Sequence, residues 1–140
     1  YVRYGDKVFS SVIEKGEADV ILSFEQLESA RWLPYLKKGG VLITGTQKID
    51  PMPVIMGKAK YPDGIIEKLK ENEIKVVPVD ALGLALKAGS AKSANVVLLG
   101  AAVRFLGIEK ESFSEIVKTS VPPKTVEANL KAFEYGYEAE

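Results

Sequence analysis

Two pairs of glutamates are the residues best suited to acid–base chemistry in this sequence. Glu14 and Glu17 are three positions apart, and so are Glu25 and Glu28. Two neighbouring carboxyl groups act as general acid and general base when their environments separate their pKa values. Both pairs lie in polar stretches, however, and glutamate rarely occurs in a protein interior. We therefore interpret both pairs as parts of a solvated surface.

Hydroxyl groups form a second set of candidates for chemistry. They cluster at Ser10–Ser11 and between Thr44 and Thr46, without a recognisable base beside them. The segment Thr44–Gln47 follows an apolar run that is predicted to be a parallel strand. Ligands of open α/β sheets bind beyond the carboxyl ends of such strands, so this position is a hint of a ligand site.

Asp80 also follows an apolar run and has two interpretations. It is either an acid that binds a ribose or the N-cap of a helix over 81–86, and we favour the cap because Asp is among the best N-cap residues. The sequence contains no Gly-x-Gly-x-x-Gly and no phosphate-loop motif. Gly39–Gly40 and Gly45 are better explained as a helix stop and a strand end. No cofactor-binding residue is therefore assigned.

The composition narrows the possible chemistry further. The 140 residues include no cysteine and no histidine. A thiolate nucleophile, a disulfide and cysteine ligation of an iron–sulfur cluster are therefore excluded for this sequence, and the commonest zinc ligand and neutral general base are missing. We predict that the chain supplies no catalytic residue and no metal ligand. The lack of cysteine also suits a reducing cytoplasm.

The charge balance bears on the possible partners. Lysine and arginine number 19, and aspartate and glutamate also number 19, so the formal net charge is zero. A nucleic-acid partner is not expected without a basic excess. A membrane partner is not expected for the same reason, since an anionic membrane surface attracts basic segments. In addition, no apolar run approaches the roughly 20 residues that span a bilayer. The length and the 46% apolar content are typical of one globular domain.

The candidate residues depend on a central unit that runs from Ala18 to Thr46. Val20–Leu22 and Val41–Ile43 are continuous apolar runs, and helical spacing over Leu27–Pro34 separates them, with Gly39–Gly40 as the expected helix stop. Strands that are apolar on both faces are typical of parallel sheets covered by helices. The pattern therefore predicts a βαβ unit in an α/β fold.

The flanking segments supply further strands. Tyr1–Phe9 reads as a hairpin around a Gly-Asp turn, and Val54–Met56 as a short edge strand. Val76–Val77 is expected to be an interior strand together with the two central runs. Pro78 indicates that this strand lies at an edge or ends there. A helix is predicted between these strands, starting near Pro62 and ending near Asn72.

The C-terminal half is predicted to be helical. The helix over Ser93–Leu106 is apolar nearly all round, so it lies either deep in the core or between the core and a partner. In the second case Asn95, Gly100 and Ala101 are the candidate residues of a partner interface, since small residues let another backbone approach closely. In the first case Asn95 is a core asparagine whose hydrogen bonds are satisfied within the domain. In the last helix a single apolar stripe is expected to dock on the domain. Its members are Val126, Leu130, Phe133 and Tyr137.

Several segments, taken in order, resemble one protein family. They are Val2–Ser10, Tyr35–Gly40 before the Val41–Thr44 run, Val79–Ala81, Ser93–Ala101 and Ala132–Tyr137. The family is the gamma-type domain of the 2-oxoacid:ferredoxin oxidoreductases, and the likeness is greatest to its indolepyruvate-type beta subunits. It covers essentially the whole chain. No single motif is diagnostic, and the order of the segments carries the resemblance.

The resemblance implies a Rossmann-like three-layer domain with a mostly parallel sheet over residues 1–140. The family domain usually starts with a strand and a turn similar to Gly-x-Gly-Gly-Gln-Gly, and this sequence contains neither. The domain is therefore expected to be incomplete at its N-terminus and to lack that first strand and glycine-rich turn. Any phosphate-contacting role of the turn has no counterpart among these residues.

The resemblance also implies a function, as a small accessory subunit of a cytoplasmic enzyme complex. Such a complex oxidatively decarboxylates arylpyruvates to aryl-acetyl-CoA and reduces ferredoxin. Thiamine diphosphate and the iron–sulfur clusters are expected in a large catalytic partner subunit, with coenzyme A as co-substrate and ferredoxin met through the complex. Two alternatives stay open. One is the gamma subunit of a pyruvate or branched-chain 2-oxoacid enzyme, and the other is a free-standing module that binds a nucleotide or metabolite.

Overall fold

A computed structural model of the chain describes residues 1–139. The strands are β1 (Ala18–Ser23), β2 (Leu36–Gly45) and β3 (Lys75–Val79). The α-helices are α1 (Gln26–Trp32), α2 (Met52–Ile55), α3 (Ile65–Glu71), α4 (Ala81–Ala88), α5 (Ala94–Val103), α6 (Lys110–Ser120) and α7 (Val126–Glu138). Three short 3-10 turns are η1 (Leu33–Tyr35), η2 (Ala91–Ser93) and η3 (Pro123–Thr125).

The three strands form a parallel sheet with the order β1-β2-β3, which confirms the expected parallel arrangement. Within the described residues only β2 is paired on both sides. The expectation of interior strands is therefore wrong for Val20–Leu22 and for Val76–Val77. Both runs are apolar because helices cover both faces of the sheet. An edge strand that is covered in this way is as apolar as an interior strand, so the sequence pattern does not distinguish the two. Pro78 lies in edge strand β3, as its missing N–H predicts.

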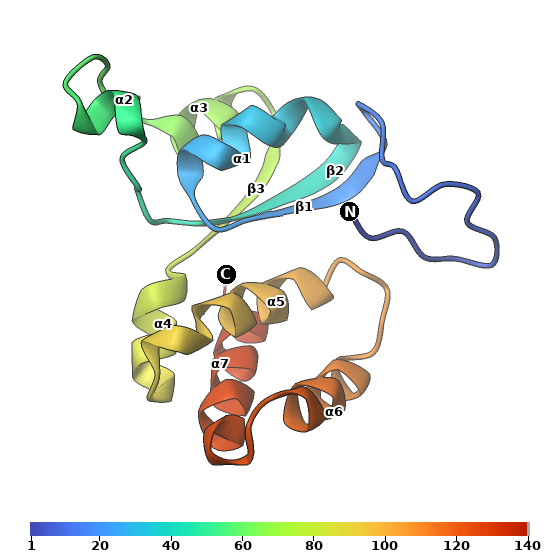
Figure 1. Ribbon diagram of the computed structural model, residues 1–140. Helices are drawn as coiled ribbons and strands as arrows, with labels where there is room; N and C mark the ends of the chain where they lie inside the picture. Colours follow the sequence, from blue (N-terminus) through green and yellow to red (C-terminus); the bar gives the residue numbers. More distant parts are fainter. Residues whose placement is uncertain (140) are drawn as a thin grey trace.

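Helices cover both faces of the sheet (Figure 1). α1 and α3 lie on one face, and α4, α5 and α7 lie on the other. Successive side chains of β2 alternate between the two faces. Leu42 belongs to a small core with Ile65 and Leu69, whereas Ile43 belongs to a larger core with Val97 and Phe133. The expected three-layer α/β architecture is thus confirmed.

Gly39 and Gly40 lie inside β2, so the predicted helix stop at this position is wrong. α1 ends at Trp32, and η1 leads directly into β2. The pairing with β1 shifts its register opposite the two glycines. Gly39 has a φ of 79°, and a Cβ atom on Gly40 would come within 2.9 Å of the carbonyl oxygen of Asp19. The glycines therefore serve an irregular strand that passes close to β1.

The N-terminal segment Tyr1–Phe9 contains no strand, so the predicted hairpin is wrong. Side chains attach the segment to the domain instead. Arg3 forms an ion pair with Glu17 at 3.0 Å, and the hydroxyl of Tyr4 donates a hydrogen bond to the carbonyl oxygen of Leu106. A turn signal alone does not form strands, because a two-stranded hairpin needs a packed face to be stable in water.

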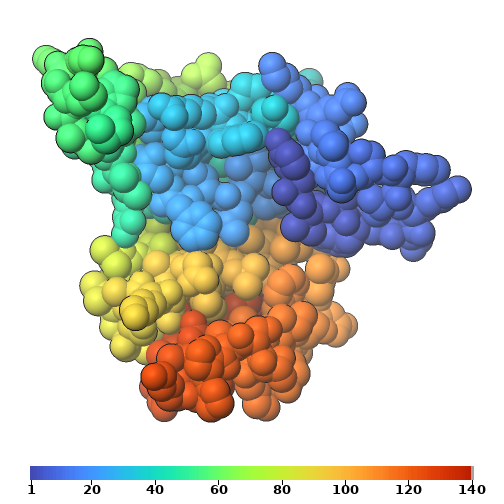
Figure 2. All heavy atoms as spheres, viewed as in Figure 1, coloured from blue at the N-terminus to red at the C-terminus, as the bar shows by residue number. Residues whose placement is uncertain are grey.

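Val54–Met56 is expected to be a strand, but Val54 and Ile55 lie in α2 and Met56 is the C-cap of that helix. Pro51 caps this helix in an extended conformation. Pro53 lies in the first turn, where the missing N–H of a proline costs no helical hydrogen bond. Three apolar residues are too few to distinguish a strand from a helix by their period. The region of α2, drawn in green, stands out from the body of the molecule in Figure 2.

The helices after β3 agree with the expected ones. Asp80 is the N-cap of α4, and its carboxylate accepts a hydrogen bond from the amide of Gly83 at 3.0 Å, which confirms the cap interpretation. α7 packs along α5, and Phe133 is fully buried between them and the sheet. The prediction that the apolar stripe of the last helix docks on the domain is therefore confirmed.

Candidate functional site

The polar groups with the most extensive buried contacts lie at the carboxyl edge of the sheet. β1 ends at Ser23, and the chain turns within two residues into α1. Glu25 is the N-cap of that helix and has the extended backbone of a cap, with φ −149° and ψ 145°. The hydroxyl of Ser23 donates a hydrogen bond to the carbonyl oxygen of Glu25 at 2.8 Å. This turn places the Glu25 side chain inside the protein, where the residue is only 5% exposed.

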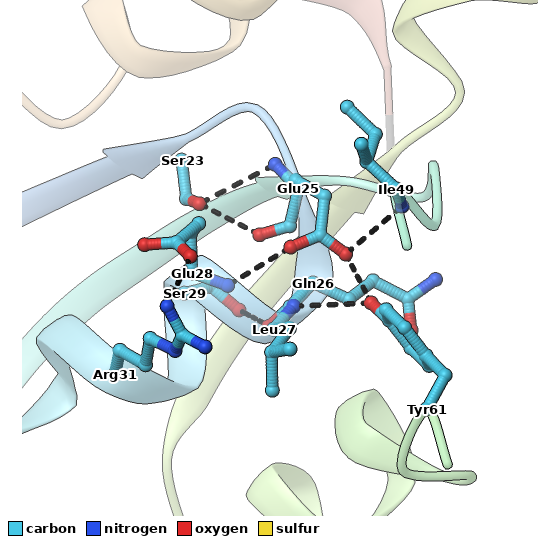
Figure 3. Close-up of polar contacts among 9 residues, drawn as sticks. All are labelled: Ser23, Glu25, Gln26, Leu27, Glu28, Ser29, Arg31, Ile49 and Tyr61. Carbon is cyan, nitrogen blue, oxygen red and sulfur yellow. Dashed lines mark hydrogen bonds and ion pairs between the residues drawn. The ribbon is translucent and has the colours of Figure 1, made fainter. Parts of the chain in front are cut away.

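The Glu25 carboxylate joins three parts of the chain (Figure 3). One oxygen accepts the amide of Glu28 at 3.0 Å, which caps α1. The other accepts the amide of Ile49 at 3.3 Å and the hydroxyl of Tyr61. The Tyr61 oxygen in turn accepts the amide of Leu27 at 3.2 Å. We call Glu25 and these donors the Glu25 clamp, because it attaches residues 49 and 61 to the start of α1.

The hydrogen bonds of the clamp keep Glu25 ionised although it is buried. Burial by itself raises the pKa of Glu25. The hydrogen bonds from Tyr61 and from the backbone of Glu28, Leu27 and Ile49 outweigh it and hold the pKa below the ordinary value of 4.5. Burial, followed by the hydrogen bond to Glu25 and its negative charge, raises the pKa of Tyr61 well above its usual range. The contact is therefore a charge-assisted hydrogen bond at neutral pH.

The glutamates expected on the surface divide between two environments. Glu28 is exposed and pairs with Arg31 at 2.9 Å, as a solvated helix face predicts. Glu25 is buried, so its interpretation as a surface residue was wrong. Ser, Thr, Asp and Asn are the usual N-cap residues, so the residue type of Glu25 did not predict a cap. The position of Glu25, two residues beyond a buried strand, is the signal that was available.

The segment Thr44–Gln47 lies at the same edge and forms hydrogen bonds within the chain. The Gln26 side chain donates to the carbonyl oxygen of Thr46 at 2.6 Å, and the Gln26 amide donates to that of Gln47 at 3.4 Å. The Thr46 amide donates to the carbonyl oxygen of Val79 at 3.0 Å. Thr44 is fully buried. These bonds fasten the ends of β2 and β3 to α1, and the ligand site suggested here stays a prediction.

The clamp is built for positioning rather than for proton transfer. Both oxygens of the Glu25 carboxylate already accept hydrogen bonds, so a substrate proton would have to displace Tyr61 or a backbone amide. Among residues 1–139 no three His, Cys, Asp or Glu side chains come together as a metal site. The arrangement therefore fixes both ends of the segment between residues 46 and 64 relative to α1.

The three residues expected at a partner interface have different positions. Asn95 is exposed on α5, whereas Gly100 and Ala101 are buried within the chain. A Cβ atom on Gly100 would meet the carbonyl oxygen of Phe133 and would lie 2.9 Å from the amide nitrogen of Tyr137. The small residues of α5 thus allow α7 of the same chain to approach. Of the three, only Asn95 lies on the surface, and an interface through these residues stays a prediction.

A hollow of about 570 Å³ lies at the opposite edge of the sheet, between the N-terminal segment and the start of β1. Its charged side chains are already paired with one another or with neighbours, since Arg3 contacts Glu17 and Asp19 contacts Lys37. No helix within residues 1–139 combines the length and apolar character that crossing a membrane requires. Because the charged groups of the hollow are already paired, we take the Glu25 clamp and the segment between residues 46 and 64 as the candidate functional site.

Comparison with known proteins identifies the family to which this chain belongs. The family model for pyruvate ferredoxin/flavodoxin oxidoreductase matches residues 1–139, and the chain belongs to this family. Among characterised sequences it is similar to "Indolepyruvate oxidoreductase subunit IorB" of Pyrococcus horikoshii, with 44% identity over 99% of this chain and 71% of the relative. The protein of the same name from Thermococcus kodakarensis is 42% identical over the same shares.

Solved structures support the same placement. The gamma subunit of a keto/oxoacid ferredoxin oxidoreductase from Geobacter sulfurreducens superposes with a TM-score of 0.64 at 28% identity, covering 91% of this chain and 67% of that one. Pyruvate oxidoreductase subunit PORC from Thermotoga maritima superposes with a TM-score of 0.59 at 25% identity, covering 86% and 62%. The resemblance to the gamma-type domain that the sequence suggested is therefore confirmed.

Proposed function

We propose that this chain is the small accessory subunit of an indolepyruvate:ferredoxin oxidoreductase. One observation carries the choice of substrate class. Thermococcus kodakarensis has both an indolepyruvate oxidoreductase subunit IorB and a common gamma subunit of pyruvate and ketoisovalerate oxidoreductases. The chain is 42% identical to the first and 29% identical to the second. Because both relatives come from the same organism, the difference between the two identities does not arise from different distances between organisms. The higher identity therefore favours the indolepyruvate enzyme.

The reaction assigned to the whole complex is the oxidative decarboxylation of an arylpyruvate to an aryl-acetyl-CoA, with electrons passed to ferredoxin. Thiamine diphosphate and iron–sulfur clusters supply the decarboxylation and the electron transfer. The residues of this chain do not fit a cluster, since the sequence has no cysteine and no histidine. We assign the chain a structural and docking role, with the cofactors in the large catalytic subunit. A cytoplasmic location belongs to the same proposal.

Reconstitution tests this function. The chain is co-expressed with a large subunit of an indolepyruvate oxidoreductase from its own source organism, and reduction of ferredoxin with coenzyme A is measured for indolepyruvate, pyruvate and ketoisovalerate. We expect a stable complex with its highest kcat/KM on indolepyruvate, and a loss of activity when the chain is omitted. A preference for pyruvate or ketoisovalerate would assign the chain to the related gamma subunits. Failure to form a complex, together with a nucleotide-induced rise in Tm, would favour a free-standing binding module.

A further inference from the structure

The segment between β2 and α3, residues 46–64, forms an arm that carries α2 away from the rest of the domain (Figures 1 and 2). Four large apolar side chains of the arm face solvent. They are Ile49, Met52, Ile55 and Met56, with exposed fractions of 60%, 63%, 66% and 55%. Surface residues of this kind are common singly, but a cluster on one projecting element marks an interaction site.

Prolines and short-range hydrogen bonds restrict the conformation of the arm within the chain itself. Pro51 and Pro53 restrict its backbone, and the amide of Met56 donates to the carbonyl oxygen of Met52 at 2.9 Å. The carbonyl oxygen of Pro53 accepts the amide of Lys58 at 2.8 Å. A preorganised element loses little conformational freedom on binding, so more of its contact energy contributes to affinity.

The Glu25 clamp fixes the two ends of the arm relative to the sheet. Its carboxylate accepts hydrogen bonds from the amide of Ile49, before α2, and from the hydroxyl of Tyr61, after α2. Lys48 adds an ion pair with Asp63 at 3.7 Å and lies 5.6 Å from the centre of the Tyr61 ring. The buried Glu25 carboxylate at the base of the arm thus orients the apolar helix α2 at its far end.

Charge at the tip indicates the chemistry of the partner. Lys58 and Lys60 follow α2 directly and are exposed, and neither forms an ion pair within residues 1–139. Within the described residues each copy has two such lysines for one acidic residue of the arm outside an ion pair, Asp50, so a symmetric contact centred on α2 would keep an excess of positive charge and a second copy is a poorer partner than a carboxylate-rich surface. A surface with carboxylates around an apolar cleft complements both features of the arm.

We propose that the arm inserts α2 into an apolar cleft, rimmed by carboxylates, on the large subunit of the complex. This inference rests on the proposed function for the existence of that subunit. Met52 and Ile55 enter the cleft, where the flexible thioether of methionine adapts to an irregular surface. Lys58 and Lys60 pair with acidic residues at the rim, where they raise the association rate and add salt dependence.

Affinity measurements on the reconstituted complex test the arm directly. The double substitution Met52→Gln with Ile55→Gln is compared with Val12→Gln and Ile116→Gln, two apolar residues that are exposed to a similar degree elsewhere. We expect the arm variant to bind the large subunit at least about tenfold more weakly. The control variant should bind as the wild type does. All four positions are exposed, so circular dichroism should report an unchanged fold for both variants.

The charged rim is tested with Lys58→Glu and Lys60→Glu, against Lys92→Glu and Lys124→Glu as the control. The arm pair should slow association and reduce its salt dependence, and the control pair should do neither. Wild-type affinity in both arm variants would overturn the proposal that the arm docks on the large subunit, and it would leave the proposed function intact. If the wild-type chain does not bind the large subunit, the proposed function fails first. Self-association that depends on the arm would overturn the choice of partner.

Discussion

The hydroxyl of Tyr61 donates a hydrogen bond to the carboxylate of Glu25, which lies 36 residues earlier in the sequence. Tyr61 comes from the returning end of the arm, and Glu25 caps α1 at the carboxyl edge of the sheet. The bond therefore links the helix that covers the sheet with the segment that we propose for docking. Its strength decides how firmly the arm is oriented.

Replacing Tyr61 with phenylalanine should destabilise the domain by about 1–3 kcal/mol. The change leaves the buried Glu25 carboxylate without its side-chain donor and the Leu27 amide without its acceptor, and both groups lose a hydrogen bond inside the protein. Urea unfolding measures the effect. Tyr35→Phe is the matched control, since no hydrogen bond of the Tyr35 hydroxyl is found within the described residues. An equal loss in both variants would contradict a special role for Tyr61.

Glu25→Gln should remove part of the dependence of stability on pH. A carboxyl group whose pKa is lower in the folded state stabilises the protein above its unfolded pKa, and this contribution is lost as the pH falls through the folded value. The pKa of Glu25 lies below 4.5 in the fold, so the loss should occur below that pH. The free energy of unfolding of wild type and variant should therefore differ most near neutrality and converge in acid.

Glu28→Gln is the control for this experiment. Glu28 lies on the solvent side of α1, and its carboxylate forms an exposed pair with Arg31, which contributes about 0.5 kcal/mol or less. Its backbone amide, which donates to Glu25, is unchanged by the substitution. Its stability profile between pH 7 and pH 3 should follow that of the wild type. A parallel shift of both variants at all pH values would mean that Glu25 acts through packing rather than through its charge.

Gly100→Ala and Gly136→Ala should each destabilise the domain, although alanine favours a helix by about 1 kcal/mol over glycine. A Cβ atom at either position meets the backbone of the facing helix, since Gly100 lies against Phe133 and Gly136 against Val97. Forcing the helices apart costs roughly 1–3 kcal/mol. Asn95→Ala, on the exposed side of α5, should change the Tm little. If the glycine variants are as stable as wild type, the close helix contact is not required.

Phe133→Ala should cost about 3–5 kcal/mol of unfolding free energy, because it leaves a cavity in the larger of the two cores. Phe9→Ala provides the comparison, since Phe9 is 84% exposed in the N-terminal segment. Its effect should stay within about 0.5 kcal/mol. Chemical denaturation of both variants checks the prediction, and similar midpoints would place Phe133 outside the core.

The elements that the sequence predicted correctly are those with a strong local signal. Val41–Ile43 is apolar because both faces of β2 are covered, and Asp80 caps α4 with the residue type that caps prefer. The stripe that includes Phe133 identified the buried side of α7. In each case the cause of the structure lies within a few residues, so a single sequence is sufficient.

The features that the sequence missed depend on contacts between distant segments. Gly39–Gly40 has the type of a helix stop, and only its closeness to Asp19 shows that it serves an irregular strand. Glu25 is of a surface type, and its burial follows from donors at positions 49 and 61. The helix that packs closely against Gly100 is α7 of the same chain. A small residue in the sequence predicts a close approach of some backbone, but it does not identify which one.

The packing of α7 on α5 has a consequence for the order of events during synthesis. The larger core needs Phe133, so it stays open until the ribosome has released α7. Up to that moment Val97 and its apolar neighbours on α5 are exposed to solvent in the nascent chain, and such surfaces are prone to aggregation. Translation pauses placed before residue 126 should therefore lengthen the interval in which the growing chain depends on chaperones.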